Sequence, residues 1–221
     1  MSALLVYKSG SSDCDDPVFT QIAADLAERS FSVIPNALPP SLSASLFQQI
    51  QALSPAQFDP AGVGRDHAHT LNQFVRRDSI RWISGQTEAE RAWLQWSERL
   101  RHSLNQQLFL GLFSFESHFA HYSPGDFYKK HLDAFKTDAF KTHALNRTTN
   151  RMLSVVAYFN PGWLPDDGGE LLIYNAAGTE TQLQVIPAYA TLAVFLSEDV
   201  PHEVLPARRD RYSIAGWFRS N

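Results

Sequence analysis

Cysteine is almost absent from this sequence: Cys14 is the only one among 221 residues. A single cysteine cannot form a disulfide within the chain, and it excludes a metal site built from several cysteines. A strong net charge is also missing, because 19 Lys and Arg stand against 23 Asp and Glu and leave a charge of -4. This balance gives no overall attraction for nucleic-acid phosphates, so we expect no nucleic-acid partner.

Long hydrophobic runs are missing as well. No stretch approaches the length of a membrane span. The opening residues, MSALLVYKSG, have neither the cationic start nor the apolar core of a signal peptide. Together with the lack of disulfides, this pattern predicts a cytoplasmic protein without a membrane partner.

Apolar residues are plentiful, with 44% hydrophobic and 12% aromatic content, which is enough for one sizeable core. We expect a single domain over residues 1–221, with a flexible terminus at 1–16, supporting helices within 17–110 and a β-rich core at 111–221. Apolar residues at helical spacing predict helices at 17–29, 41–53 and 87–109. A loop at 54–73 is long enough to be functional or mobile.

The second half of the chain has a different texture. Short apolar or alternating runs, bounded by turn residues, occur at 113–122, 128–133, 152–159, 171–174, 182–186, 191–196, 203–205 and 212–218. This spacing is typical of a jelly roll. We therefore predict an α+β fold that is mainly β, a double-stranded β-helix (jelly roll) core with N-terminal supporting helices.

Three residues of this region have the pattern of a metal site. A strand sends alternate side chains to one face, so His131 and Asp133 can point together at one ion, and His202 on a later strand can supply a third ligand. Two imidazoles and one carboxylate leave coordination positions open, as in non-haem Fe(II) oxygenases. The sequence DAFKT occurs twice, so Asp138 is the alternative carboxylate, but the period of two favours Asp133.

Other histidines are weaker candidates. His67 and His69 also lie two residues apart, but they fall in the long loop without a nearby carboxylate, and we interpret them as solvated side chains. His118 and His121 have no carboxylate two residues further on, and we interpret them as structural. Arg211 lies nine residues after His202 and is expected to face inward, where its guanidinium can bind a carboxylate with two hydrogen bonds.

The match to a known family extends well beyond the metal pattern. The order His-x-Asp, distal His and later Arg resembles the 2-oxoglutarate-dependent oxygenase superfamily. Residues 122–133 are similar to the Tyr-x-x-Gly-x-x-Tyr-x-x-His-x-Asp pattern of its prolyl hydroxylases. Further segments resemble the hypoxia-inducible-factor prolyl hydroxylases in the same order: VRRDSIRWISG (75–85), AYFNPGW (157–163), GGELLIY (168–174) and PHEVLPA (201–207).

This resemblance implies a set of cofactors and site residues. It implies Fe(II), the cosubstrate 2-oxoglutarate and O2, with ascorbate as a stimulant. The cosubstrate is expected to bind Arg211, Tyr158 and Tyr122. The loop at 54–73 corresponds to one that closes over a peptide in this family. Four residues are expected to contact the substrate: Arg76, Asp78, Tyr128 and Trp217.

The activity implied by the resemblance is hydroxylation of a prolyl residue in a protein to 4-hydroxyproline, with succinate and carbon dioxide as the other products. The chain looks like a compact bacterial-type member, and for such members the resemblance implies a substrate unrelated to procollagen, the translation factor EF-Tu. An oxygen-sensing role is compatible with this chemistry. The alternatives are a hydroxylase of a ribosomal protein or of a free small molecule, and a non-catalytic jelly roll used for binding or sensing.

Overall fold

The computed structural model describes residues 16–62, 74–134 and 151–220. The three α-helices of the described residues are α1 (Pro17–Arg29), α2 (Pro40–Ala52) and α3 (Glu88–Leu108), and the first strand, β1 (Phe31–Ile34), lies between α1 and α2. The Asp16 side chain accepts a hydrogen bond from the Val18 amide and caps α1, with Pro17 in its first turn. All three predicted helices are confirmed within about two residues, because each has one continuous apolar stripe.

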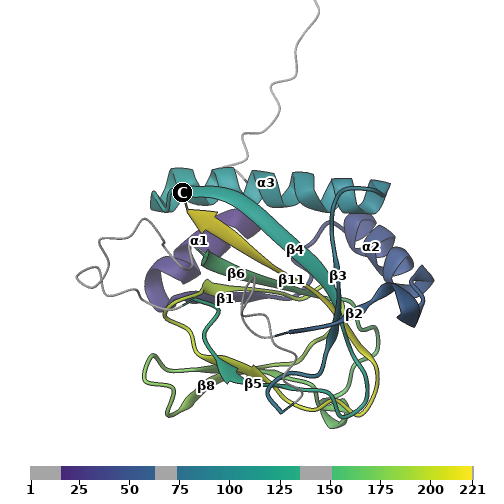
Figure 1. Ribbon diagram of the computed structural model, residues 1–221. Coiled ribbons are helices and arrows are strands. Elements are labelled where there is room, and N and C mark those ends of the chain that lie inside the picture. Colours follow the sequence, from purple (N-terminus) through teal and green to yellow (C-terminus); the bar gives the residue numbers. More distant parts are fainter. Residues whose placement is uncertain (1–15, 63–73, 135–150, 221) are drawn as a thin grey trace, which may run out of the picture.

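Two antiparallel sheets form the rest of the fold (Figure 1). The major sheet has the order β1-β9-β6-β11-β4-β3-β2, and the minor sheet has the order β5-β10-β7-β8. This arrangement confirms the predicted jelly roll. The remaining strands are β2 (Asp59–Pro60), β3 (Ser79–Trp82), β4 (Leu112–Tyr122), β5 (Tyr128–His131), β6 (Arg151–Tyr158), β7 (Leu171–Tyr174), β8 (Thr181–Val185), β9 (Leu192–Leu196), β10 (His202–Val204) and β11 (Arg211–Ser220).

Two details differ from the expected strands. β3, which pairs with β4 over its whole length, was not predicted, because four residues of mixed polarity carry no periodic signal of their own. β5 ends at His131, so Asp133 lies beyond the strand and not within it. The strand alternation that predicted a shared face for His131 and Asp133 therefore does not reach Asp133. Both side chains still lie in the same cluster.

One face of the major sheet packs against the helices, and the other lines the pocket between the sheets. Ile214 and Phe218 of β11 point to the helices, where they join a core with Leu100 and Leu104 of α3. Arg211, Ser213, Ala215 and Trp217 alternate with them and face the space between the sheets. The strand that lies centrally in the major sheet thus supplies core residues on one side and site residues on the other.

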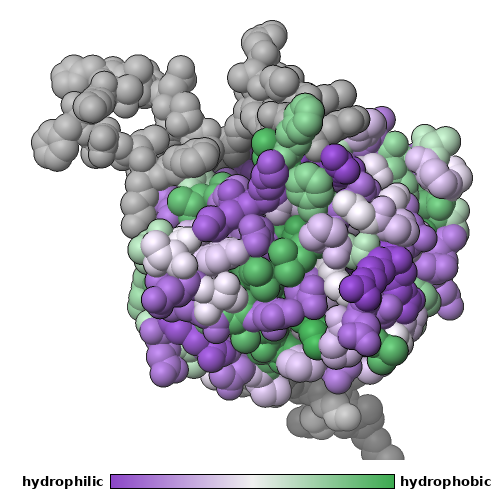
Figure 2. Space-filling view, turned by 90° about the horizontal axis from the view of Figure 1, so that it is seen from below, coloured by the Kyte–Doolittle hydropathy of each residue, from purple (hydrophilic) through white to green (hydrophobic). Residues whose placement is uncertain are grey.

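The helices cover only one side of the molecule. In Figure 1 they lie against the outer face of the major sheet, and no described helix lies below β5 and β8 of the minor sheet. Figure 2 views the molecule from that uncovered side and shows a strip of hydrophobic residues bordered by hydrophilic ones. No helix among the described residues is both long enough and apolar enough to cross a membrane.

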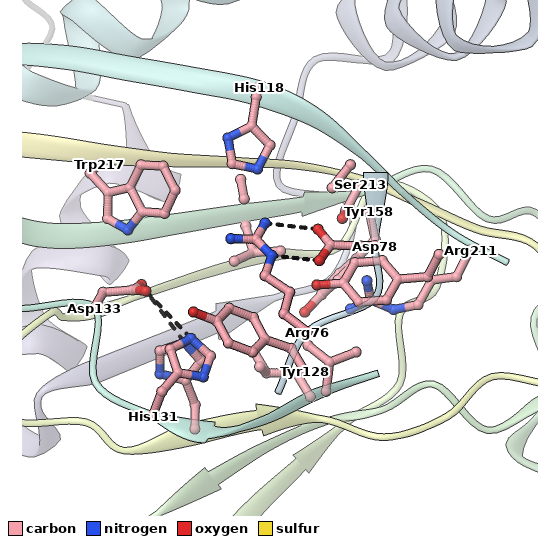
Figure 3. Close-up of a pocket in the computed structure, with 17 residues that line it drawn as sticks. Arg76, Asp78, His118, Tyr128, His131, Asp133, Tyr158, Arg211, Ser213 and Trp217 are labelled. Atoms are coloured by element: carbon pink, nitrogen blue, oxygen red, sulfur yellow. Dashed lines mark hydrogen bonds and ion pairs between the residues drawn. The ribbon is translucent and has the colours of Figure 1, made fainter. Parts of the chain in front are cut away.

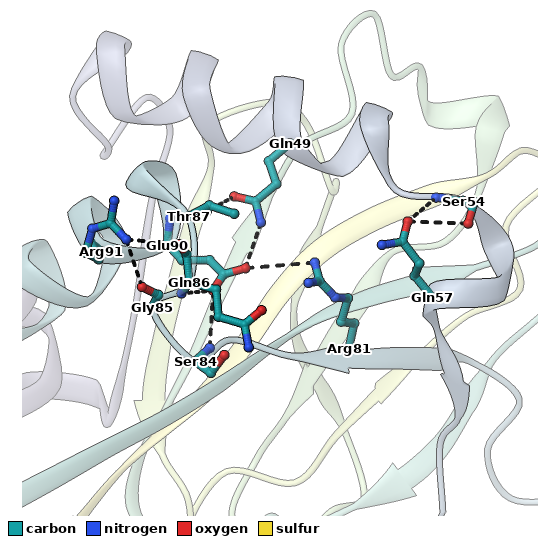
Figure 4. Close-up of polar contacts among 10 residues, drawn as sticks. All are labelled: Gln49, Ser54, Gln57, Arg81, Ser84, Gly85, Gln86, Thr87, Glu90 and Arg91. Carbon is teal, nitrogen blue, oxygen red and sulfur yellow. Dashed lines mark hydrogen bonds and ion pairs between the residues drawn. The ribbon is translucent and has the colours of Figure 1, made fainter.

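A buried carboxylate connects the helices to β3 (Figure 4). Glu90, in the first turn of α3, is only 1% exposed. Its carboxylate accepts hydrogen bonds from Gln49 of α2 (2.7 Å) and from the backbone amides of Ser84 (3.3 Å) and Gln86 (3.0 Å). The guanidinium of Arg81 on β3 lies 3.8 Å away. One side chain therefore fixes α2, α3 and the end of β3, the strand that follows the pocket residues Arg76 and Asp78.

Replacing Glu90 with Ala is expected to lower the free energy of unfolding by about 3 kcal/mol, because it leaves the partly buried guanidinium of Arg81, the amide of Gln49 and two backbone amides without their acceptor. Urea unfolding followed by circular dichroism measures this change. The control is Glu88→Ala, which removes an exposed carboxylate from the same helical turn and should change stability by less than about 1 kcal/mol. Equal losses in the two variants would contradict the role of Glu90.

Candidate metal and carboxylate site

A single pocket between the two sheets brings the predicted site residues together (Figure 3). The pocket spans about 490 Å³, part of which is open to solvent. Residues from β4, β5, β6, β7, β10 and β11 line it, with the segment before β3 closing one side. The lining includes all ten residues predicted from the sequence: Arg76, Asp78, Tyr122, Tyr128, His131, Asp133, Tyr158, His202, Arg211 and Trp217.

Three of these side chains form a cluster that can hold a metal ion. His131, Asp133 and His202 each offer one ligand atom, and these atoms lie within 4.8 Å of one another. The Asp133 carboxylate is 3.5 Å from Nε2 of His131 and 3.7 Å from Nε2 of His202. The two histidines are cross-strand partners in the β5–β10 pair, which explains how residues far apart in sequence meet here.

The backbone sets the orientation of both imidazoles. Nδ1 of His131 donates to the carbonyl oxygen of Lys129 (2.7 Å), and Nδ1 of His202 donates to that of Val200 (3.0 Å). With the proton on Nδ1, each ring keeps a lone pair on Nε2, directed at the cluster. Burial first, and then the neighbouring His131, lower the pKa of His202 to about 4 against the opposing effect of Asp133. At neutral pH His202 is therefore uncharged, as a metal ligand must be.

Asp133 is held as a carboxylate. Burial alone would raise its pKa, but His202, His131 and a hydrogen bond from Ser154 outweigh burial and hold the pKa well below its ordinary value. Oγ of Ser154 lies 2.6 Å from the carboxylate and 2.9 Å from Oγ of Ser197. The resulting chain of two hydroxyls orients the carboxylate from behind. A set of two imidazoles and one oriented carboxylate suits a divalent transition metal.

The alternative metal-site residues fall elsewhere. Asp138, His67 and His69 lie outside the described residues. His121 pairs with Asp210 (2.7 Å) and lies on the outer side of β4, in agreement with the structural role expected for it. His118 is different: it lines the pocket, and the expectation of a purely structural role missed this placement. The alternation of 118, 120 and 122 along one strand was the signal that could have revealed it.

The other end of the pocket contains a buried cation. Arg211 is 1% exposed, and its Nε donates to the carbonyl oxygen of Gly169 (2.9 Å). Its guanidinium lies over the rings of Tyr122 (4.8 Å) and Tyr158 (5.0 Å). No carboxylate of the described residues pairs with Arg211. A buried guanidinium without a counter-ion at the end of a pocket is a binding site for a carboxylate or another anion.

Tyr158 completes this end of the pocket. Its ring is fully buried, and its hydroxyl has no hydrogen-bond partner among the described residues. Burial raises the pKa of Tyr158 to about 12, against the opposing effect of Arg211, so the hydroxyl keeps its proton and can donate it. Gly169 allows the close approach of Arg211, since a Cβ there would lie 3.1 Å from Cδ of Arg211 and the φ angle is +69°.

The remaining predicted residues line the middle of the pocket and its metal end. Arg76 binds the carboxylate of Asp78 through two hydrogen bonds of 2.5 and 2.8 Å, and its guanidinium lies 4.7 Å over the Tyr128 ring. Tyr128 in turn stacks on His131 with ring centroids 3.5 Å apart. Trp217 is nearly buried, with the Arg151 guanidinium 3.5 Å over its ring. Aromatic and paired charged side chains thus surround the cluster.

Comparisons with known proteins agree with this geometry. Residues 117–219 match the family model of the 2OG-Fe(II) oxygenase superfamily. A crystal structure of a prolyl-4-hydroxylase from Pseudomonas putida is 40% identical in sequence, with a TM-score of 0.77 over 92% of this chain and 99% of that one. The chain belongs to the 2OG-Fe(II) oxygenase superfamily. It is an Fe(II)- and 2-oxoglutarate-dependent dioxygenase with a fold like that of the prolyl hydroxylases.

Two further structures extend the likeness of this oxygenase. A prolyl hydroxylase from Trichoplax adhaerens, in complex with a peptide fragment of the hypoxia-inducible factor, is 26% identical, with a TM-score of 0.76 over 93% of this chain and 90% of that one. A viral collagen prolyl hydroxylase from Paramecium bursaria chlorella virus 1, in complex with 2-oxoglutarate, is 15% identical, with a TM-score of 0.60 over 88% and 98% of the two chains. The latter supports the fold alone.

The Ser154 hydroxyl, which donates a hydrogen bond to Asp133, should affect metal affinity. Replacing Ser154 with Ala is expected to weaken Fe(II) binding about 10–100-fold, because the carboxylate loses the group that orients it. Anaerobic calorimetric titration of the metal-free oxygenase measures the affinity. Ser114→Ala, an exposed serine of β4, is the control and should bind Fe(II) as the unchanged protein does. An unaltered affinity in the Ser154 variant would show that Asp133 needs no such support.

Proposed function

We propose that this oxygenase hydroxylates a prolyl residue of a protein to 4-hydroxyproline. The observation that carries the proposal is the pairing, within one pocket, of a three-residue metal cluster and the buried, unpaired Arg211. The prolyl assignment is supported by the 40% identity to the Pseudomonas putida prolyl-4-hydroxylase and by the likeness to the enzyme bound to a peptide of the hypoxia-inducible factor. In the overall reaction, O2 and 2-oxoglutarate convert the C–H bond into C–OH and yield succinate and carbon dioxide.

The residues at the two ends of the pocket would divide the work. His131, Asp133 and His202 would hold Fe(II), which supplies the centre at which O2 and 2-oxoglutarate react. Arg211 would bind the far carboxylate of 2-oxoglutarate, and Tyr158 would donate its free hydroxyl proton to the same group. Tyr122, whose ring lies against the Arg211 guanidinium, would form the wall beside that carboxylate.

The residues around the metal cluster would position the target. The Arg76–Asp78 pair, Tyr128 and Trp217 would surround the proline ring and keep water away from it. Because Arg76 is fixed by two hydrogen bonds and by the Tyr128 ring, this wall is ordered before substrate arrives. Residues 63–73 of the loop predicted at 54–73 lie outside the described residues.

EF-Tu is the protein substrate that we propose, in a cytoplasmic setting. The proposal also treats residues 1–221 as one catalytic domain, supported by the core that the helices share with the major sheet. An oxygen-sensing role would follow if turnover varies with oxygen over the cellular range. The residues of the metal cluster do not distinguish a protein from a free small molecule, so hydroxylation of a ribosomal protein or of a small molecule is the alternative result of the test.

The test uses purified EF-Tu, the oxygenase, Fe(II) and 2-oxoglutarate under 18O2, followed by peptide mass spectrometry. The expected result is one EF-Tu proline that gains a single 18O atom only when 2-oxoglutarate is present. An EF-Tu that stays unmodified, while 2-oxoglutarate is converted to succinate, would exclude EF-Tu as the substrate. The same digestion applied to ribosomal proteins then tests the second candidate.

A further inference from the structure

His118 is a histidine without a function in the account above. It lies on β4 at the face shared with Ala120 and Tyr122, and its strand partner on β11 is Ala215. The small side chain of Ala215 leaves room for the ring, and Figure 3 shows the ring pointing into the pocket on the side of Trp217 and away from Arg211. The residue is 1% exposed, and neither ring nitrogen has a hydrogen-bond partner among the described residues.

A buried imidazole without protein partners is unfavourable, since both nitrogens have left water and gained no hydrogen bond in return. The charge state of His118 decides which hydrogen-bonding groups a ligand must offer. Burial first, and then the positive charges of Arg76 and Arg151, lower the pKa of His118 to about 3, against the opposing effect of Asp133. The ring is therefore neutral at physiological pH and offers one N–H donor and one lone pair.

Trp217 provides a second unused donor beside it. The ring centroids of His118 and Trp217 lie 5.4 Å apart, and Nε1 of Trp217 has no partner among the described residues. The half-exposed ring of Trp82 meets the other side of His118 edge-on at 5.2 Å. The charged neighbours already have carboxylate partners, because Arg76 binds Asp78 and Arg151 binds Glu116 (3.1 Å).

These groups match an uncharged ligand that has both an acceptor and a donor. A peptide amide is such a group. In a prolyl substrate, the peptide bond before proline has no N–H, whereas the bond after it has both C=O and N–H. Only the bond after proline has an N–H that can donate to the acceptor nitrogen of a neutral histidine.

We propose that His118 is a substrate-binding residue that accepts a hydrogen bond from the N–H of the residue following the target proline, while Nε1 of Trp217 donates to another carbonyl oxygen of the peptide. The inference rests on the proposed prolyl hydroxylation and adds a feature to the substrate: the residue after the proline must keep its amide hydrogen. A second proline at that position is disfavoured for the same reason.

The test compares two peptides that differ in this one hydrogen. N-acetyl-Ala-Pro-Gly-amide and the counterpart with N-methylglycine in place of glycine are titrated into the oxygenase loaded with Zn(II) and 2-oxoglutarate, and the indole N–H signals are followed by 15N NMR. The unchanged protein is expected to bind the glycine peptide about 3–10-fold more tightly, the range for one hydrogen bond. The His118→Leu variant is expected to bind both peptides equally.

Two further variants control the experiment. His121→Leu removes a histidine of the same strand that pairs with Asp210 outside the pocket, and it should keep the preference for the glycine peptide. His118→Gln keeps a donor and an acceptor and should restore part of the preference. Since Leu removes an unpartnered polar group, His118→Leu should melt no earlier than the unchanged protein.

The outcomes separate the inference from the function on which it rests. A preference that persists in His118→Leu, or that the unchanged protein lacks, overturns the role of His118 and leaves prolyl hydroxylation standing. Failure of the unchanged protein to bind either peptide, while 2-oxoglutarate still binds, overturns both. Loss of the preference in His118→Leu alone, with its partial return in His118→Gln, supports the proposal.

Discussion

An Asp133→Ala variant is expected to lose all measurable Fe(II)-dependent conversion of 2-oxoglutarate to succinate. Asp133 is the only carboxylate among the described residues that joins His131 and His202 in the metal cluster. Without it, two neutral imidazoles remain, and they hold a hard, doubly charged cation much more weakly than the full set does. Succinate formation and the bound iron content, measured on the same samples, should fall together.

The repeat in the sequence supplies a matched control for this variant. Asp138 begins the second copy of DAFKT, so it is the same residue type in the same local sequence, five positions after Asp133. Asp138→Ala should retain both iron and turnover. The reverse pattern, with activity lost at Asp138 and kept at Asp133, would transfer the carboxylate ligand to the second copy and contradict the cluster seen in the structure.

An Arg211→Lys variant is expected to bind 2-oxoglutarate at least about 10-fold more weakly, which corresponds to the loss of a charged hydrogen bond. Lysine keeps the positive charge but lacks the planar group that can bind a carboxylate through two parallel hydrogen bonds. It also loses the Nε donor that anchors Arg211 to Gly169. The KM for 2-oxoglutarate should rise, while Fe(II) affinity stays unchanged because the metal cluster lies at the other end of the pocket.

Arg209→Lys provides the comparison for the Arg211 variant. Arg209 is two residues away but is exposed, and it interacts with Asp167 at the surface. Its replacement should leave the KM for 2-oxoglutarate as it is. An unchanged 2-oxoglutarate affinity in Arg211→Lys would contradict the assignment of this guanidinium to the cosubstrate.

Much of the site could be predicted because it follows strand periodicity. Arg211 and Trp217 alternate on one strand, and the His131–His202 pair needs only that two distant strands become neighbours, as they do in a jelly roll. The three helices could be predicted as well, since each carries an apolar stripe. Segment matches to the prolyl hydroxylases supplied Arg76, Asp78 and Tyr158, which no local pattern distinguishes from ordinary structural residues.

Other features depend on tertiary contacts and left no local signal. The reach of Asp133 into the cluster depends on Ser154 of β6 and not on strand alternation, because β5 ends two residues earlier. The strand β3 is ordered by pairing with β4, and the role of Glu90 arises only where α2 and α3 meet. His118 has the same strand spacing as Tyr122, but only the structure shows that its nitrogens are buried without partners.

The central claim is that this chain couples 2-oxoglutarate oxidation to hydroxylation of a protein-bound proline. The most direct measurement is succinate production from 2-oxoglutarate and Fe(II) in air, with and without a cell lysate, followed by mass spectrometry of the lysate proteins. The account predicts that the lysate increases succinate formation and that one protein gains the mass of an oxygen atom on a proline. Binding of 2-oxoglutarate with no lysate stimulation and no modified protein would contradict the claim and favour a free small molecule as substrate.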